Sequence, residues 1–305
     1  MNFRSILGPL HTWPAVLIVS LGCAGASAAT RDVDQHQAAD PAGTVEIINV
    51  AGSVQVSGWD KAEVAVGGTI GEKVERVELT STGKHTTVRV VLPKGNSWGG
   101  DGAANLTVQV PRGSSIDASL VSADLKVGGV TGAQQLRTVS GDITTDGGSG
   151  ARVNTISGKV QLGVADGAEA NVHSISGDLT VKGAGGEVSI ETVSGDGRLT
   201  LGELKNFHLE TVSGDFRISA RLAAAAEFNA ESVSGDVEAK FSGTPGVDFE
   251  LESLSGRLKD CSGHQPSGEQ HGPGSHLAFT TGDGKSKVRM DSKSGNLSVC
   301  VGQND

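Results

Sequence analysis

Four aspartates recur at one position of a repeated phrase, where their carboxylates could bind a cation. Each follows a serine by two residues, at intervals of 18 to 21 residues: Asp178, Asp196, Asp215 and Asp236. If the repeats stack about 4.8 Å apart, unit charges in water repel by roughly 1 kcal/mol per pair, and Ca²⁺ would relieve that repulsion. Aspartate also suits a tight turn, and the nonapeptide spacing of calcium-binding β-rolls is missing. We therefore favour turn aspartates without a bound cofactor, and keep a calcium row as the alternative.

A second acidic row lies three residues before the same kind of serine. It consists of Glu191, Glu210, Glu231, Glu252 and Asp291. Regular spacing of this kind is typical of the solvated face of a strand. The alternative is a surface for a basic partner or for cations, whose affinity would fall with added salt.

Histidines suggest metal binding or catalysis. The segment 261–276 contains three of them, His264, His271 and His276. His-rich tracts bind zinc or copper, but the Gly, Pro and Ser content of this segment favours a surface loop inserted into the repeat. His173 and His208 lie among serines and acids, yet neither has a nucleophile motif around it. We predict that the chain is not an enzyme, and a glycan-acting solenoid with clustered acids is the enzyme alternative.

A repeat of about 20 residues, built around a Ser-Gly pair, positions these side chains. Its central serines are Ser140, Ser157, Ser176, Ser194, Ser213, Ser234, Ser255 and Ser294. Counted from each serine, positions −6, −4 and +3 are mostly apolar and position −2 is Ser or Thr, an alternation typical of a strand with one buried face. Position −1 is also apolar in every copy except the last. We expect positions −2 and −1 both to face inward, next to a corner that the glycine permits.

The repeat predicts the fold class. Each unit reads as strand, corner and strand, and it is too short to bury its own apolar face, so it must stack on its neighbours. The fixed phase of the phrase favours an all-β, single-domain, parallel β-solenoid over the alternative, a β-sandwich. We assign residues 44–132 to irregular N-terminal capping coils and residues 133–301 to regular coils with the inserted loop 261–276. Residues 30–43 carry no pattern and are expected to be a linker.

Composition narrows the possible functions. The chain has 45 Gly in 305 residues, about twice the usual share of roughly 7%, which suits a turn in every repeat. Aromatic residues make up 3% and Tyr is absent, so the core is thin and aliphatic, and an aromatic platform for bases or sugars is unsupported. A net charge of −10 excludes a sequence-independent binder of nucleic acid.

Residues 1–29 have the three regions of a secretory signal peptide: a basic start at Arg4, an apolar stretch over 15–21 and a small-residue exit at 26–29. We expect cleavage after Ala28 or Ala29. The alternative is a lipid anchor at Cys23, because Leu-Gly-Cys-Ala resembles a bacterial lipoprotein signal. No later apolar run approaches 18 residues, so the mature chain is predicted to have no transmembrane helix.

Export would place the two remaining cysteines in an oxidising compartment. These are Cys261 and Cys300. Two cysteines in such a compartment are expected to pair, and a disulfide here would close a loop of about 40 residues. Two unpaired thiols are the alternative.

The phrase and the first strands carry a family resemblance. The recurrent Ser-Gly-Asp, the opening VEIINVAGSVQVSGW over 45–59 and VQVPRG over 108–113 resemble the bacterial β-strand-repeat "putative adhesin" family. This resemblance implies a right-handed parallel β-solenoid in the cell envelope, at the surface or in the periplasm, and it supplies no catalytic motif. We expect an exported adhesin or interaction scaffold with an envelope protein or glycan as its partner. A periplasmic partner in envelope maintenance or sensing is the alternative within binding proteins.

Overall fold

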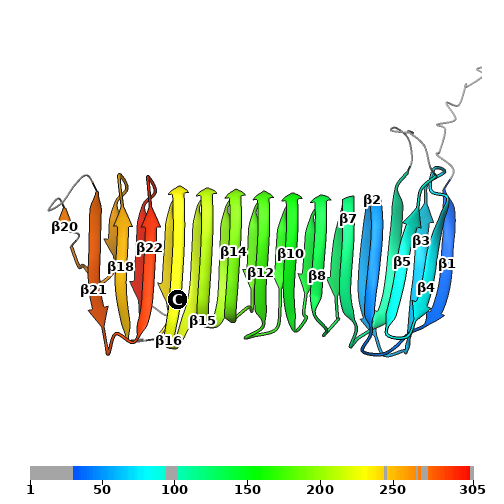
Figure 1. Cartoon of the computed structure of the whole chain (residues 1–305), viewed down its shortest axis with the longest axis horizontal. Coiled ribbons are helices and arrows are strands. Elements are labelled where there is room, and N and C mark those ends of the chain that lie inside the picture. The colour runs from blue at the N-terminus through cyan, green and yellow to red at the C-terminus, as the bar shows by residue number, and fades with distance from the viewer. Residues whose placement is uncertain (1–29, 94–101, 244–245, 266, 269–273, 303–305) are drawn as a thin grey trace, which may run out of the picture.

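The chain forms a straight rod of β-coils that lie side by side (Figure 1). This computed structural model describes residues 30–93, 102–243, 246–265, 267–268 and 274–302, and the expected signal peptide and Cys23 fall outside them. Every regular element in the described ranges is a strand, and the strands belong to one sheet of mixed direction. No helix among them is long and apolar enough to cross a membrane.

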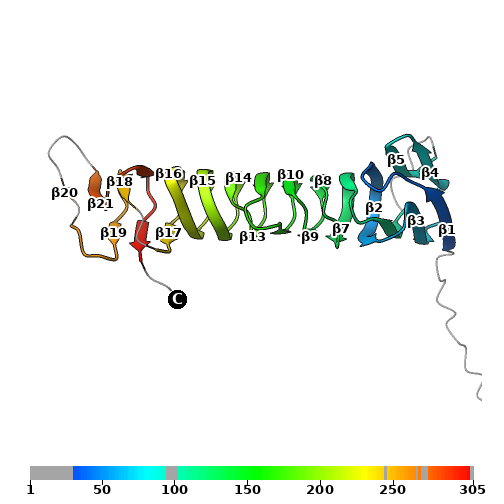
Figure 2. The same ribbon diagram turned by 90° about the horizontal axis from the view of Figure 1, so that it is seen from below.

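Each regular coil consists of a first arm, a corner and a second arm. The first arms are β8 (Gln134–Ser140), β10 (Gly150–Ser157), β12 (Glu169–Ser176) and β14 (Gly186–Ser194). The second arms are β9 (Ile143–Asp146), β11 (Val160–Gly163) and β13 (Leu179–Lys182). In the next two coils the arms merge into long strands, β15 (Gly197–Ser213) and β16 (Phe216–Ser234). First arms pair in parallel with first arms and second arms with second arms, so the two kinds run along opposite sides of the rod (Figure 2).

The core fills the space between the two sets of arms. Positions −4 and +3 of the phrase are buried in successive coils, for example Val153 and Val160 with Val172 and Leu179. Position −6 is also buried, and toward the C-terminal end it carries aromatic rings: Phe207 stacks on Phe228 with ring centroids 4.4 Å apart. Parallel pairing in register places equivalent residues above one another, so one repeated pattern builds one continuous core.

The corner explains why Ser-Gly recurs. Gly195 has φ +126°, and a Cβ there would lie 2.3 Å from the carbonyl oxygen of Gly177 in the neighbouring coil. Only glycine combines left-handed angles with this close approach. The buried hydroxyl at position −2 supports the turn, as where Thr155 Oγ1 donates to the Ser157 carbonyl at 3.3 Å.

Seven strands build the N-terminal end: β1 (Arg31–Ala38), β2 (Thr44–Trp59), β3 (Glu63–Ile70), β4 (Arg76–Thr82), β5 (His85–Val91), β6 (Ala104–Pro111) and β7 (Ser115–Gly128). Although β2 comes first of the parallel strands, it lies inside the stack, between β7 on one side and β5 and β6 on the other. Antiparallel β3 and β4 extend the outer edge through β6 and β5, and β1 pairs antiparallel with β3.

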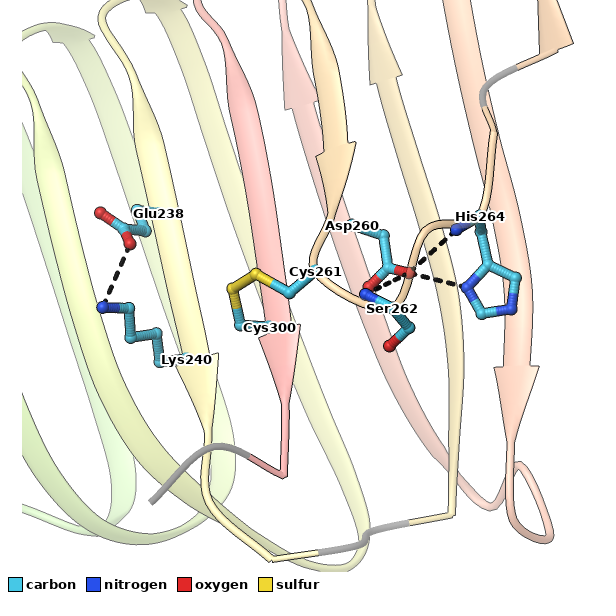
Figure 3. The surroundings of a disulfide bond; sticks show 7 residues. All are labelled: Glu238, Lys240, Asp260, Cys261, Ser262, His264 and Cys300. Carbon is cyan, nitrogen blue, oxygen red and sulfur yellow. Dashed lines mark hydrogen bonds and ion pairs between the residues drawn. A yellow bond between two sulfur atoms is a disulfide. The ribbon is translucent and has the colours of Figure 1, made fainter. Parts of the chain in front are cut away.

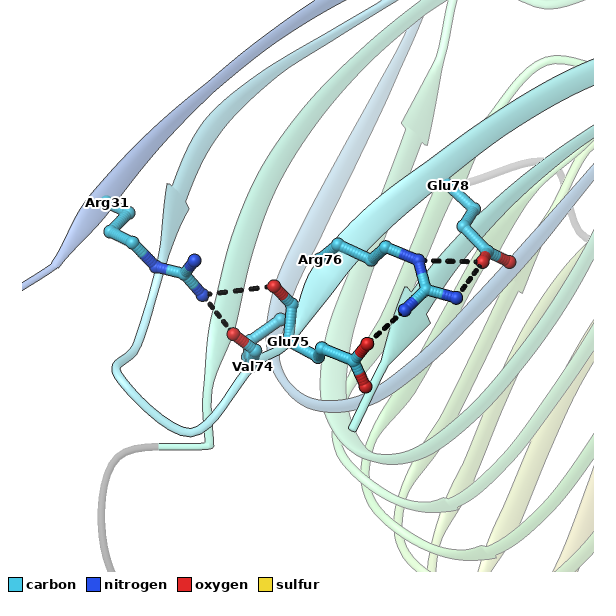
Figure 4. A network of polar contacts seen from close by, with 5 residues as sticks. All are labelled: Arg31, Val74, Glu75, Arg76 and Glu78. Carbon is cyan, nitrogen blue, oxygen red and sulfur yellow. Dashed lines mark hydrogen bonds and ion pairs between the residues drawn. The ribbon is translucent and has the colours of Figure 1, made fainter. Parts of the chain in front are cut away.

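Residues 30–43, expected to be a linker, instead contain the edge strand β1. The sequence pattern misses it because β1 has no buried face, so no apolar alternation marks it. Backbone pairing with β3 and side-chain bonds hold it. Gln35 Nε2 donates to the Val77 carbonyl at 3.0 Å, and Arg31 donates to the carbonyls of Val74 and Glu75 (Figure 4).

Seven strands build the C-terminal end: β17 (Val237–Phe241), β18 (Val247–Ser253), β19 (Leu258–Asp260), β20 (Ser267–Gly268), β21 (Ser275–Thr281), β22 (Ser286–Ser292) and β23 (Leu297–Val301). The last coil lies between two earlier ones, because β22 pairs in parallel with β16 and β18 while β23 pairs with β17 and β19. Antiparallel β21 covers β18 at the end of the rod, and β20 pairs with β21. The expected loop 261–276 therefore contains β20 and the start of β21.

The fold class predicted from the repeat is confirmed: the chain is an all-β, single-domain, solenoid-like stack. A disulfide joins Cys261 and Cys300, whose Cα atoms lie 5.0 Å apart, and links the end of β19 to β23 (Figure 3). Beside it, the buried Asp260 carboxylate accepts bonds from His264 Nδ1 at 2.7 Å and from the Ser262 amide at 3.0 Å. Burial raises the pKa of Asp260, but these bonds outweigh it and leave the pKa below its ordinary value.

Candidate functional site

Position −1 of the phrase faces the solvent, which corrects the expectation that it packs inward beside position −2. In the described residues, the exposed large apolar side chains are Val121, Val139, Ile156, Ile175, Val193, Val212, Val233 and Leu254. Seven of them stand at position −1, and Val121 stands in the equivalent place before Ser122, which pairs in register with Ser140; the exposed fractions run from 40% to 56%. Strand alternation continues to position −1, so position −2 is buried and position −1 points out, and it ends at the serine, which is exposed as well. We call these eight residues the apolar row.

The first seven members of the apolar row occupy adjacent coils without interruption. Residues on either side of them pair in register, as where Ser174 and Ser176 align with Thr192 and Ser194. Lys293 follows Val233 in space because its coil lies next to β16, where the amide of Ser294 donates to the Val233 carbonyl at 3.1 Å. Leu254, directly after β18, lies beyond it.

The acidic residues at position −3 form a second continuous row beside the first. In spatial order they are Glu191, Glu210, Glu231, Asp291 and Glu252. The prediction that they lie on a strand's outer face agrees with their exposure, although Glu191 is half-buried. Partial desolvation raises the pKa of the Asp291 carboxyl, and the negative charges of Glu252, Glu231 and Glu250 raise it further. We call these five residues the acidic row.

A groove follows the two rows along the rod. It is lined by positions −3, −2 and −1 of the coils from β12 to β18, and His276 on β21 lies at one end. Its volume is about 1290 Å³, above the roughly 300–1,000 Å³ of pockets that enclose drug-sized ligands. An open channel of this size, with one apolar and one acidic side, suits an elongated ligand.

The four aspartates of the predicted cation row lie at the corners and bond the backbone of the next coil. Asp178 Oδ1 accepts the Asp196 amide at 3.3 Å, and Asp196 Oδ1 accepts the Asp215 amide at 2.9 Å. The series continues from Asp215 to the amide of Asp236 and from Asp236 to the amide of Asn296, at 2.9 Å each. This ladder accounts for aspartate at the turn, and the calcium row stays a prediction.

The predicted histidine tract separates into two environments, with His271 outside the described residues. His264 stacks on Phe279, with ring centroids 4.3 Å apart, and bonds Asp260. His276 lies 3.9 Å from Glu252, and with Glu250 these residues bring one possible ligand atom each within 4.8 Å of one another. Exposed acidic groups of this kind are common without an ion, so this cluster alone does not indicate a metal site.

The two histidines within the regular coils, His173 and His208, contact acids at position −3. His173 Nδ1 lies 2.9 Å from Glu191 Oε2, and His208 Nε2 lies 3.1 Å from Glu210 Oε1. Neither ring is therefore placed as the general base of a serine nucleophile.

Comparison with known proteins follows the architecture. A family model described as Toastrack DUF4097 matches residues 35–300, nearly all of the rod. The chain belongs to the Toastrack DUF4097 family. No curated protein matches it.

Three solved structures resemble this Toastrack chain over about nine-tenths of its length. A "putative adhesin" from Bacteroides fragilis is 12% identical, with a TM-score of 0.42 and coverage of 90% of this chain and 100% of the other. A "putative cell adhesion protein" from Clostridium sporogenes is 11% identical (TM-score 0.27; 89% and 100% covered). A "putative lipid binding protein" from Parabacteroides distasonis is 10% identical (TM-score 0.31; 90% and 96% covered). These low scores add nothing to the family match, which carries the assignment.

The groove itself was missed from sequence, although a signal for it is present. Position −1 carries Val, Ile or Leu in seven of the eight copies, next to a position −2 that is always Ser or Thr. A strand that strictly alternates would have placed the apolar member outside, since position −4 faces the core. Exposed apolar residues at a repeated position would then have indicated a contact surface.

Proposed function

We propose that this Toastrack chain is an exported, non-enzymatic interaction protein of the bacterial envelope, acting as an adhesin or scaffold through the groove. The apolar row carries this proposal. Soluble proteins rarely expose contiguous apolar patches of several hundred Å², and such patches commonly mark binding surfaces. Here the apolar side chains recur at one position on adjacent coils. The Ser and Thr residues at position −2 that line the groove are buried, which supports a binding role over a catalytic one.

The proposal predicts that the purified rod binds bacterial envelopes through position −1. The test variant is Val193→Thr/Val212→Thr/Val233→Thr, which keeps side-chain shape and β-branching while removing apolar surface. We expect the parent protein to sediment with whole cells or isolated envelopes, and the triple variant to lose most of that retention at unchanged secondary structure. Equal retention of both proteins would contradict binding through the groove, and turnover of an envelope polysaccharide would contradict a non-enzymatic role.

Export and the mature N-terminus are a separate part of the proposal. The signal-like segment over 1–29 and the cysteine pair support it. The intact mass of the protein recovered from the envelope fraction distinguishes a chain that starts near Ala29 from one that keeps a lipidated Cys23. A full-length mass in the cytoplasmic fraction would contradict export.

A further inference from the structure

The spacing of the apolar row limits what can lie along it. Coils stack about 4.8 Å apart, so the seven uninterrupted members from Val121 to Val233 span about 29 Å. An α-helix presents one apolar ridge residue per turn, every 5.4 Å, and covers this length with about 19 residues. An extended peptide repeats on one face about every 6.6 Å, which matches the coils less well. The groove runs across the strands, whose backbone groups already pair between coils, so an added strand would also find no free edge there.

The charge beside the apolar row determines the chemistry of the partner. The acidic row covers five adjacent coils from β14 to β18, and it overlaps the uninterrupted apolar row at β14, β15 and β16. Among the described residues, Glu191, Glu210 and Glu252 each have a histidine as an ion-pair partner, at 2.9, 3.1 and 3.9 Å, while Asp291 lies between Glu231 and Glu252 in register. Aligned like charges repel, so a row of cations laid over them would be attracted.

The same charges disfavour two other occupants. A second copy of this chain brings a net charge of −10 against an equal charge, and an anionic membrane meets the acidic row directly. A basic partner has neither problem.

We propose that the groove binds a cationic amphipathic α-helix that lies along the rod axis. Its apolar face packs on the uninterrupted row from Val121 to Val233, which lines the groove from Ile175 onward, and Lys or Arg side chains along one flank meet Glu191, Glu210 and Glu231 where the two rows overlap. This inference rests on the proposed function, since it names the class of partner for the same groove. A helix that enters this groove buries apolar surface and neutralises like charges at once.

The test uses three synthetic peptides of about 19 residues, the helix length that spans the apolar row. The basic peptide has Leu at helical spacing on one face and Lys along one flank. A second peptide has Glu in place of every Lys, and a third has the basic composition in a scrambled order without an apolar face. We expect the basic peptide to bind the disulfide-bonded rod and gain helical circular dichroism, and the other two to bind at least about tenfold more weakly.

Matched variants locate the binding. Val193→Thr/Val212→Thr/Val233→Thr is expected to weaken the basic peptide about tenfold. Glu210→Gln/Glu231→Gln is expected to weaken it about threefold and to reduce its salt dependence. The control Glu203→Gln/Glu227→Gln changes exposed carboxylates of the same two strands outside the groove, so it should bind like the parent.

Several outcomes would overturn the inference. They are equal binding of the basic and scrambled peptides, insensitivity to the valine variant, or an equal loss in the control. Preferential binding of phosphatidylglycerol vesicles over the peptide would assign the groove to a membrane surface, and self-association through the valines would assign it to a second copy. Retention on envelopes without peptide binding would reject the helix and leave the proposed function standing, whereas peptide binding without retention would reject the proposed function.

Discussion

At the scale of single residues, a corner aspartate can act in two ways: its oxygen can accept a backbone hydrogen bond, and its negative charge can attract a cation. Each carboxylate accepts the amide of the next coil through one oxygen. Asn296 does the same for the Arg257 amide at 3.0 Å, so an amide side chain can replace the carboxylate. The chain thus already contains the substitution that separates the two roles.

We predict that Asp196→Asn/Asp215→Asn retains parent stability, whereas Asp196→Ala/Asp215→Ala loses about 1 kcal/mol per missing bond. The measurement is urea unfolding. A melting temperature that rises in millimolar Ca²⁺ for the parent and not for the Asn variant would support the calcium row. The absence of any Ca²⁺ effect on the parent would remove it.

Asp291 is expected to lower the stability of the fold at neutral pH. Its folded-state pKa is raised by desolvation and by Glu252, Glu231 and Glu250, against an opposing effect of Arg289. A raised pKa means that the folded state binds the proton more tightly, so the contribution is most favourable below the unfolded pKa and is lost as pH rises through the folded pKa.

Asp291→Asn should therefore stabilise the rod at pH 7 by about a few tenths of a kcal/mol, the scale of exposed like-charge pairs, and give no gain near pH 3. Thermal melting of both proteins across this pH range is the measurement. A destabilised variant at pH 7 would show that Asp291 contributes to the fold rather than opposing it.

At the scale of elements, the Ser-Gly corner sets the distance between coils. At Gly195, a Cβ would meet the neighbouring backbone as well as requiring a left-handed conformation. Gly128, at the end of β7, has neither restriction, because no neighbouring atom lies within 4 Å of the position that a Cβ would take there.

We expect Gly195→Ala to destabilise the rod by about 1–3 kcal/mol, the usual cost of a strained backbone, while Gly128→Ala stays within about 1 kcal/mol of the parent. Chemical denaturation of the two variants under one set of conditions provides the comparison. Similar losses at both sites would mean that the corner tolerates a side chain.

At the scale of the whole molecule, both ends depart from chain order. β2 lies between strands that follow it, and the coil of β22 and β23 lies between two coils that precede it. The copy at Ser294 therefore stacks directly on the copy at Ser234, although the copy at Ser255 comes between them in the sequence. The disulfide holds this inserted coil at its last strand.

Reduction of Cys261–Cys300, or replacement of both by Ser, is expected to lower unfolding stability by about 3–4 kcal/mol for a closed loop of this length. Amide exchange should increase first in β22, β23 and β18, since these strands depend on the inserted coil. Uniform exchange along the rod would show that the end coils are not a separate unit. A mass gain of about 2 Da on reduction verifies the bond in the exported protein.

The sequence by itself determined the local unit and its stacking. The alternation up to position −2, the glycine at +1 and the pairing of Cys261 with Cys300 follow from side-chain type and spacing, because strand periodicity, left-handed backbone and cysteine number are properties of short segments. β1 was missed because its residues bury no apolar face.

Only the tertiary structure decided which face position −1 occupies and which coils are neighbours. If the corner moves by one residue along the phrase, the side chains next to it exchange the buried face for the exposed face. The sequence is compatible with either position of the corner. Any two coils with the same phrase can pair in parallel almost equally well. The order of the coils along the rod therefore depends on contacts between segments that are distant in the sequence. The continuous apolar and acidic rows, and hence the groove, result from those two decisions.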